Sequence, residues 1–397
     1  MAKVSVKNLY KIYGPKPHKA LELVKNGISK EKLLKKTGNG IGINNVNIEV
    51  EEGTIFVVMG LSGSGKSTMI RCLNRLIEPT EGEILIDGDN ICEGGEKKLL
   101  EIRRKKVAMV FQHFALFPHK TVVENVAYGL EVQNVDIKQR TEKAYESLKM
   151  VGLEGYEESY PSELSGGMQQ RVGLARALAT DADILLMDEA FSALDPLIRT
   201  EMQDELMALQ ENMKKTIIFI THDLDEALKI GDKIAIMKEG VVVQIGTPED
   251  ILHHPADEYV KTFIKDVNRT RVLTASAVMK KPDAIITQKD GIHMAVRKMQ
   301  EANISSIFVI NKERKLQGLI TIDAAVEAMK KGETDIGKLL ITEIEKTSPD
   351  TLLNDLLPVA VYAKYPIAVI DDNEKLLGII VRVRVIAGIA GEEMQNV

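Results

Sequence analysis

The 397-residue sequence lacks the long apolar run that a membrane-spanning helix needs. Its uninterrupted apolar stretches, such as IFVVM, are far shorter than the roughly 20 residues that cross a bilayer. The N-terminal segment MAKVSVKNLYKIYG also has no apolar core of the kind found in a signal peptide. We therefore expect a cytosolic chain that does not itself enter the membrane.

Cysteine and excess positive charge are also scarce. The two cysteines, Cys72 and Cys92, have neither CxxC nor His/Cys spacing, which argues against a disulfide framework and a zinc site and indicates reduced, structural thiols. The net charge of −6 provides no overall basic field for nucleic acid. Because the chain is longer than one hydrophobic core usually serves, we expect two or three globular domains.

A glycine-rich turn, GLSGSGKST at residues 60–68, follows the apolar run TIFVVM. The pattern predicts a buried strand over 54–59 and a helix over 66–77, which is the context of a phosphate-binding loop. Glycines let consecutive backbone N–H groups point at one anion, Lys66 can reach the β- and γ-phosphates, and the Ser67 hydroxyl can bind Mg²⁺. The alternative is a glycine-rich turn with an incidental lysine.

Two further apolar runs end in residues that phosphate chemistry uses. ILLMDE at 184–189 predicts a strand ending in Asp188, which can hold Mg²⁺ through water, and Glu189, which can orient or deprotonate an attacking water. TIIFITHD predicts another strand that ends beside His222, a candidate contact for the γ-phosphate and for Glu189. Such strand ends gather at one edge of a parallel sheet. The alternatives are a solvated turn for the acidic pair and a structural role for the histidine.

The stretch LSGGMQQRVGLARALA at 164–179 predicts a second phosphate-binding end. Two adjacent glycines open an apolar helix, so a second set of backbone N–H groups and a second helix dipole can face an anion. One chain then carries two separate ends that can hold a phosphate.

These motifs, in this order, resemble those of the ATP-binding-cassette ATPases over about residues 1–265. GLSGSGKST is similar to the Walker A loop, FQHFALFP to the Q-loop, LSGGM to the signature motif, LLMDE to Walker B and SALDP to the D-loop. The resemblance implies a P-loop α/β cassette with a RecA-like core, an antiparallel β subdomain and a helical signature subdomain. It also implies a homodimer of cassettes in which each ATP lies between the Walker A loop of one chain and the signature motif of the other.

The resemblance assigns roles to individual residues. Glu189 and His222 are the expected catalytic residues, and Ser67, Gln112 and Asp188 are expected to hold Mg²⁺. The expected ATP-binding residues are Tyr13, Gly60, Ser62, Gly63, Ser64, Gly65, Lys66, Ser67, Thr68, Gln112, Ser165, Gly166, Gly167 and Asp195.

A lysine-rich insert at residues 15–40 follows Tyr13, the residue expected to stack on adenine, for which Tyr10 is the alternative. Seven lysines against two glutamates give the insert a net charge of +5, with histidine neutral. The segment SKEKLLKKTG predicts a short helix with Ser29 as its N-cap and Gly38 as its stop. We expect either a solvated charged helix or a contact with anionic lipid, where a lysine contributes about 1 kcal/mol.

After a polar linker at 266–275, the sequence repeats itself with an offset of 60 residues. IFVINKERKLQGLI at 307–320 aligns with IAVIDDNEKLLGII at 367–380, and each repeat predicts strand, charged turn, strand and helix. The repeats resemble a tandem pair of CBS domains at 276–332 and 336–391, modules that commonly bind adenosine-containing ligands.

The CBS resemblance implies that Thr321 and Asp323 of the first repeat hold the phosphate and ribose of an adenine nucleotide or cyclic dinucleotide. The second repeat has valines at the matching positions, so its candidate ligand residues are the interleaved Arg382 and Arg384. The alternative is a module that only dimerises. We expect the lysine-rich insert, or another cationic surface, to respond to ionic strength, and the CBS pair to bind an inhibitory nucleotide.

The combination of features resembles the ATP-binding subunit of glycine betaine and proline betaine importers. It implies an ATPase at the cytoplasmic face of the cell membrane, which energises solute import through a separate permease with a substrate-binding domain. Choline, carnitine and proline are alternative solutes. A soluble cassette ATPase acting on DNA or ribosomes and a nucleotide-sensing regulator are alternative functions. The sequence lacks the second cassette or long coiled-coil insertions usual in the soluble class, and we expect no nucleic-acid partner.

Overall fold

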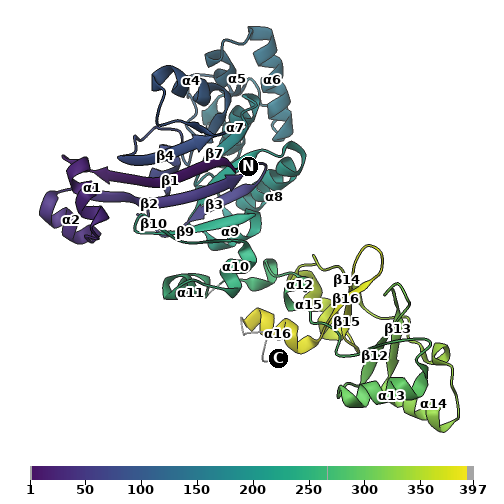
Figure 1. Cartoon of the computed structure of the whole chain (residues 1–397). Coiled ribbons are helices and arrows are strands. Elements are labelled where there is room, and N and C mark those ends of the chain that lie inside the picture. Colours follow the sequence, from purple (N-terminus) through teal and green to yellow (C-terminus); the bar gives the residue numbers. More distant parts are fainter. Residues whose placement is uncertain (1, 266, 391–397) are drawn as a thin grey trace. The chain divides into compact units, whose positions relative to one another are not determined.

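The structure is a computed structural model that describes residues 2–265 and 267–390. It divides into two compact units, Met1–Lys265 and Asp266–Val397, each of which has its own sheets and helices (Figure 1). The first residue of the predicted linker, 266, and the last of the second predicted CBS repeat, 391, lie outside the described residues. Within the described residues, every helix is too short or too polar to cross a membrane.

A six-stranded sheet forms the centre of the N-terminal unit, with the order β10-β9-β3-β8-β7-β6. All neighbouring pairs are parallel except β9 and β10. Every residue of β3, β7 and β8 is buried, as expected for strands that are covered on both faces. The strands are β3 (Ile55–Met59), β6 (Val107–Val110), β7 (Ile184–Asp188), β8 (Thr216–Thr221), β9 (Lys233–Lys238) and β10 (Val241–Gly246).

A second, antiparallel sheet has the order β2-β1-β4-β5. Its long strands β1 (Ala2–Tyr13) and β2 (Gly40–Glu51) pair along most of their length, and β4 (Glu81–Ile86) and β5 (Asp89–Asn90) complete it. Buried side chains of this sheet share one hydrophobic core with those of β3, β7 and β8. The predicted α/β class with an antiparallel subdomain is therefore confirmed.

Most strands of the central sheet are followed along the chain by a helix, and α5, α6 and α7 form a group of their own. The predicted helix over 66–77 is shorter in the structure, because α3 ends at Leu73 and Arg75 takes a left-handed φ of 53°. Helices α5, α6 and α7 pack on one another. The helices are α3 (Lys66–Leu73), α4 (Gly95–Lys105), α5 (Val122–Val132), α6 (Ile137–Met150), α7 (Gly166–Ala179), α8 (Pro196–Met213), α9 (Leu224–Ile230), α10 (Pro248–His253) and α11 (Glu258–Ile264).

The lysine-rich insert contains two helices, not one, at the end of β1 and β2 (Figure 1). Helix α1 (Pro17–Lys25) was not predicted, whereas α2 (Lys30–Thr37) is the predicted helix. Gly38 ends α2 in a left-handed conformation, but Ser29 makes no side-chain capping bond. Buried residues of both helices, including Leu21 and Leu33, pack with Ile12. The insert is thus an ordered extension of the antiparallel sheet, and six of its seven lysines are exposed.

The C-terminal unit contains two three-stranded sheets, β11-β12-β13 and β14-β15-β16. The repeat is visible in their register, because Val309 lies opposite Gly318 and Val369 opposite Gly378. Side chains of both sheets share one core, including Phe308. The elements are α12 (Ala275–Val278), β11 (Ile285–Thr287), α13 (Gly291–Glu301), β12 (Ser306–Ile310), β13 (Leu316–Thr321), α14 (Ile322–Lys330), β14 (Lys346–Thr347), α15 (Leu353–Tyr362), β15 (Ile367–Ile370), β16 (Leu376–Ile380) and α16 (Arg382–Ala390).

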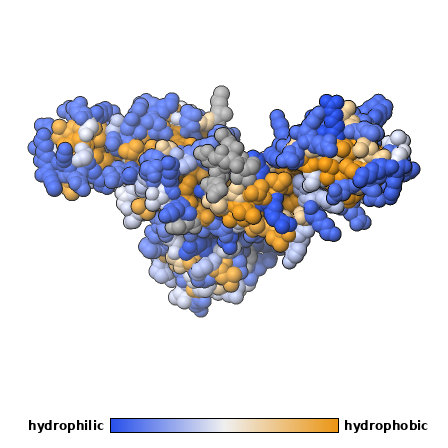
Figure 2. All heavy atoms as spheres, turned by 90° about the horizontal axis from the view of Figure 1, so that it is seen from below, coloured by the Kyte–Doolittle hydropathy of each residue, from blue (hydrophilic) through white to orange (hydrophobic). Residues whose placement is uncertain are grey.

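Hydrophilic atoms cover most of the face visible in Figure 2, and hydrophobic atoms appear as separate patches between them. Both cysteines are free thiols, Cys72 buried and Cys92 half-buried. Burial raises the pKa of Cys72 to about 12 and also raises the pKa of Cys92. Neither thiol is therefore set up to react as a thiolate near neutral pH.

Candidate functional site

Residues 60–68 form a tight loop between β3 and α3, and its back is packed against neighbouring backbone. Gly60 and Gly65 have φ values of 150° and 106°. A Cβ at Gly60 would lie 2.2 Å from the carbonyl oxygen of Met237, and one at Gly65 would lie 2.5 Å from that of Gly42. Only glycine fits at these two positions, and the loop is thereby held at a fixed distance from the strands behind it.

The ammonium group of Lys66 lies inside this loop. It donates to the carbonyl oxygens of Gly60 (2.8 Å) and Leu61 (3.2 Å), and it lies 3.8 Å from Oε1 of Glu189. Only 4% of the side chain is exposed. The pKa of Lys66 lies below its usual value, because burial lowers it by more than the nearby carboxylates of Glu189 and Asp188 raise it. A buried cation at the N-terminus of a helix is an arrangement that binds phosphate.

Asp188, the last residue of β7, has one oxygen with a partner and one without. Its Oδ2 accepts a hydrogen bond from Arg71 at 3.2 Å. Its Oδ1 is buried and has no hydrogen-bond partner in the protein. Because an unpartnered buried carboxylate oxygen is costly, this oxygen fits a hydrated Mg²⁺, which prefers oxygen ligands. Ser67, a half-buried residue in the first turn of α3, is on a helix that packs against β7.

Glu189 is the centre of a polar cluster at the edge of the sheet. Its φ of 48° is uncommon for a residue with a Cβ. Its Oε2 accepts a hydrogen bond from Nε2 of Gln112 at 3.2 Å and lies 3.4 Å from Nδ1 of His222. The structure thus brings together Lys66, Gln112, Glu189 and His222, which come from four segments far apart in the sequence. A carboxylate held in this way can take a proton from a water molecule beside a phosphate.

Sequence reasoning missed two residues of this cluster. Ser192 accepts a hydrogen bond from Nε2 of Gln112 (3.2 Å) and donates one to the carbonyl oxygen of Glu189 (2.9 Å). It is the first residue of SALDP, so the motif was noted but the role of its serine was not. Arg71 is the ion-pair partner of Asp188. Its position in α3, five residues after Lys66, gave no signal because the pairing depends on tertiary packing.

The predicted residues of the second phosphate-binding end do not join this cluster. Ser165 caps α7 by accepting a hydrogen bond from the amide of Met168, and Asp195 caps α8 in the same way. Within residues 2–265 and 267–390, no hydrogen bond or ion pair connects Ser165, Gly166, Gly167 or Asp195 to residues 60–68. Ser165 and Gly166 are exposed, so the helix end is open to a ligand or to another chain.

Tyr13, the last residue of β1, has its ring beside the phosphate loop. Its hydroxyl lies 3.2 Å from Oγ1 of Thr68, and a Cβ at Gly42 would lie 2.6 Å from its ring. Tyr13 is 41% exposed, whereas Tyr10 is only 8% exposed and packs in the core of the insert. Of the two tyrosines, Tyr13 is therefore the one with an accessible ring, and its stacking on adenine stays a prediction.

The candidate ligand residues of the C-terminal unit already have partners in the protein. Thr321 caps α14, where Asp323 lies in the first turn. Arg382 donates to three carbonyl groups at the C-terminal end of α15, and Arg384 donates to the carbonyl oxygen of Met279 at 3.0 Å. Positive charges are favourable at helix C-termini. Both arginines thus have a structural role, and a ligand role stays a prediction.

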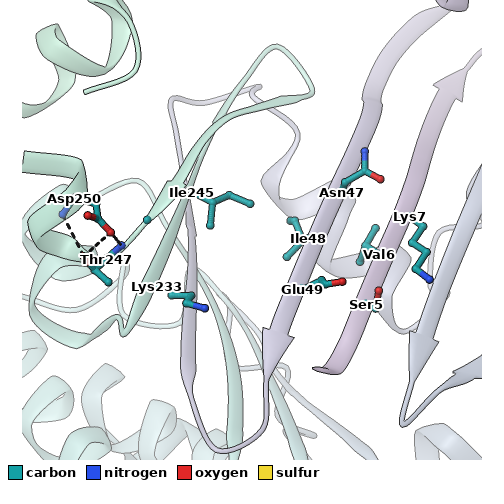
Figure 3. A pocket seen from close by; sticks show the side chains of 11 residues that line it. Ser5, Val6, Lys7, Asn47, Ile48, Glu49, Lys233, Ile245, Thr247 and Asp250 are labelled. Carbon is teal, nitrogen blue, oxygen red and sulfur yellow. Dashed lines mark hydrogen bonds between the residues drawn. The ribbon is translucent and has the colours of Figure 1, made fainter. Parts of the chain in front are cut away.

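A groove of about 530 Å³ elsewhere in the N-terminal unit is separate from this cluster (Figure 3). Figure 3 shows side chains of β1 and β2 on one side and those of β10 and α10 on the other. Thr247 and Asp250 bond to each other as the capping box of α10. The charged residues that line the groove are of both signs, so the groove has no charge preference and we assign it no ligand.

Comparisons with known proteins extend these observations. The profile of the "ABC transporter" family matches residues 43–192, and that of the "CBS domain" matches residues 275–331. The chain is 54% identical to the glycine betaine transport ATP-binding protein OpuAA of Bacillus subtilis, over 98% of this chain and 93% of that protein. It is 48% identical to the glycine betaine/proline betaine transport system ATP-binding protein ProV of Escherichia coli, over 99% of each.

A similar solved structure is the dimeric post-hydrolysis state of the ATP-binding cassette MJ0796, bound to ADP and Pi. The two proteins are 35% identical, and the match covers 62% of this chain and 98% of that chain with a TM-score of 0.52.

We expect Lys66→Ala to weaken the binding of ATP, because the substitution removes a charged donor from the loop. Hydrogen bonds to charged groups contribute about 1.5–3 kcal/mol, so the dissociation constant should rise about 10- to 100-fold. Calorimetric titration of the full chain with ATP measures this. Lys215→Ala, which removes a largely buried lysine paired with Asp181, is the control and should bind like the wild type. Unchanged affinity in Lys66→Ala would contradict the assignment of the loop.

Proposed function

The chain belongs to the ATP-binding subunits of ABC transporters, among the glycine betaine transport ATP-binding proteins, and we propose that it hydrolyses ATP to energise import of glycine betaine or proline betaine. The observation that carries the proposal is the identity of 54%, over 98% of this chain, with the glycine betaine transport ATP-binding protein OpuAA. The cluster around Glu189 supports the chemistry, because it unites a phosphate-binding lysine with a candidate base.

In the proposed mechanism, the N–H groups of residues 60–68 and the ammonium of Lys66 hold the phosphates of ATP. Asp188, Ser67 and Gln112 would hold Mg²⁺, which supplies charge stabilisation to the phosphates when it is bound. Glu189 accepts the proton of the attacking water. Gln112 and His222 fix the orientation of the Glu189 carboxylate through the contacts described above.

The second half of each ATP site comes from another copy of the chain in this proposal. The N-terminus of α7, with Ser165, Gly166 and Gly167, and the nearby Asp195 would contact the nucleotide held by the partner's phosphate loop. The dimeric state of the MJ0796 cassette with ADP and Pi supports this arrangement. It also explains why the two phosphate-binding ends of one chain make no bond to each other among the described residues.

The solute passes through a separate permease, which would hold this chain at the cytoplasmic face of the membrane. Glycine betaine appears in the names of both relatives, and proline betaine in that of the Escherichia coli protein. No residue of the ATP-binding cluster needs to contact the solute, so choline, carnitine and proline are the alternatives that a transport assay separates.

The lysine-rich insert is proposed to bind anionic lipid and to respond to ionic strength. Its two helices hold five exposed lysines, and Leu21 and Leu33 pack these helices against the sheet. Among the described residues, Lys25 is the one lysine of the insert with an ion pair, to Glu81. The other charges are available to a lipid surface, and salt screens such a contact.

The C-terminal unit is proposed to bind an adenine nucleotide or cyclic dinucleotide that slows transport. A cavity of about 390 Å³ lies at the second repeat, within the range of small-molecule sites. The residues that line it include Tyr365, the basic residues Lys364 and Arg382, and apolar residues of β15 and β16. An aromatic ring and two cations are groups that can hold a base and its phosphate.

We expect Glu189→Gln to keep ATP binding and to lose hydrolysis, because the amide keeps the shape of the side chain but cannot accept a proton. A general base contributes about a hundredfold or more to the rate, so turnover should fall by at least that factor. The measurement is phosphate release by the full chain with its permease. Glu374→Gln, at an exposed glutamate with a similar φ of 60°, is the matched control. Turnover near the wild-type value in Glu189→Gln would remove Glu189 from the role of base.

We expect the triple substitution of Lys32, Lys35 and Lys36 by glutamine to weaken binding to vesicles that contain anionic lipid. At about 1 kcal/mol for each lysine, the partition coefficient should fall roughly a hundredfold at low salt. Co-sedimentation of the full chain at low and high salt measures this, with neutral vesicles as the reference. The matched control replaces three exposed lysines of the C-terminal unit, Lys289, Lys312 and Lys375. Equal loss in both triple variants would show that the insert is not a specific lipid contact.

A further inference from the structure

The turn that follows Gln112 has an uncommon backbone conformation. Phe114 and Ala115 are consecutive residues with left-handed φ values of 55° and 49°. The amide of Ala115 bonds to the carbonyl oxygen of His113, which makes the turn very tight. Side chains with a Cβ disfavour this region, so two such residues in a row persist only where their surroundings hold them.

Arg176 of helix α7 stabilises this turn through hydrogen bonds to its backbone. Its Nη1 donates to the carbonyl oxygen of Ala115 at 2.6 Å, and its Nη2 donates to that of Phe114 at 3.0 Å. Burial lowers the pKa of Arg176, and among the described residues no carboxylate compensates its charge. The two carbonyl groups are thus the main partners of a half-buried cation, which makes their positions energetically important.

The same helix carries the signature motif. Helix α7 begins at Gly166, and Arg176 lies ten residues further on, about 15 Å along the helix axis. Gln112 lies two residues before Phe114 and donates to Glu189. A continuous series of bonded groups therefore leads from the N-terminus of α7 to the catalytic cluster of the same chain.

We propose that Arg176 is a positioning residue that fixes the turn after Gln112 and thereby links the signature helix to the hydrolysis of ATP. The inference rests on the proposed function, in which Gln112 serves the ATP on its own loop and Gly166 serves the ATP on the partner's loop. A shift of α7 is then transmitted to Gln112 through Arg176. Arginine suits this task because its planar fork donates to two neighbouring oxygens, whereas lysine offers a single charged centre.

The test is a double-mutant comparison in the full chain. Arg176→Met should lower kcat about tenfold or more, because hydrogen bonds from a charged group are lost, while the dissociation constant for ATP stays within about twofold. Arg176→Lys should lose less, about threefold, because one bond can be kept. Ala115→Gly should restore at least about threefold of kcat in the Arg176→Met chain, because glycine adopts the left-handed conformation without help.

Arg171→Met is the matched control on the same helix. Arg171 donates to the carbonyl oxygen of Val151 at 2.9 Å and pairs with Glu205 at 2.6 Å, so its loss affects stability but not the turn. It should change the unfolding midpoint without changing kcat, and Ala115→Gly should not alter its activity. If Arg176→Met does not fold, Arg176→Lys with and without Ala115→Gly gives the same comparison.

Three results would overturn the inference: wild-type kcat in the folded Arg176 variants, no rescue by Ala115→Gly, or an equal loss of kcat in Arg171→Met. The proposed function is tested separately by Lys66→Ala. If Lys66→Ala binds ATP like the wild type, the proposed function fails. If Lys66→Ala loses ATP binding while Arg176→Met keeps its kcat, only the inference about Arg176 fails.

Discussion

The structure depends on the close contact between a glycine loop and the backbone behind it. The loop has to direct its N–H groups at phosphate, and its back therefore lies against Gly42 of β2 and Met237 of β9 with no room for a Cβ. The turn between β9 and β10 adds a bond from the amide of Gly240 to the carbonyl oxygen of Ser64, and Gly240 in turn accepts one from Asn44 of β2. The antiparallel sheet and the central sheet thus meet at this loop, and both contribute to its position.

Because the glycine loop lies against the sheets, charged groups near it at the strand ends are buried. Lys66 is buried inside the loop, and Asp188 has a buried oxygen without a protein partner. These groups carry a desolvation penalty in the protein alone, which nucleotide phosphates and a hydrated metal ion can offset. The strained φ of Glu189 belongs to the same pattern, since uncommon backbone conformations tend to occur where a functional group must be held in place.

Local signals made much of this predictable from the sequence. An apolar strand, the glycine spacing and a following lysine define the phosphate loop within the fifteen residues 54–68. The offset of 60 residues in the C-terminal half corresponds to the matched registers of β12–β13 and β15–β16. Helix α1 was missed because its N-cap residue, Lys16, provides no capping side chain. The partners of Arg71, Arg176 and Arg382 were also beyond prediction, because each guanidinium bonds to a segment distant in the sequence.

The central claim is that one ATP is bound by the phosphate loop of one chain and the signature helix of another. Mixing a Ser165→Arg chain with a Lys66→Ala chain tests this most directly. Each variant alone has both sites damaged, whereas a mixed dimer has one intact site and one site damaged twice. With random pairing and independent sites, the account predicts about a quarter of wild-type hydrolysis from an equal mixture of two inactive proteins. No recovery on mixing, or full activity of Ser165→Arg alone, would contradict it.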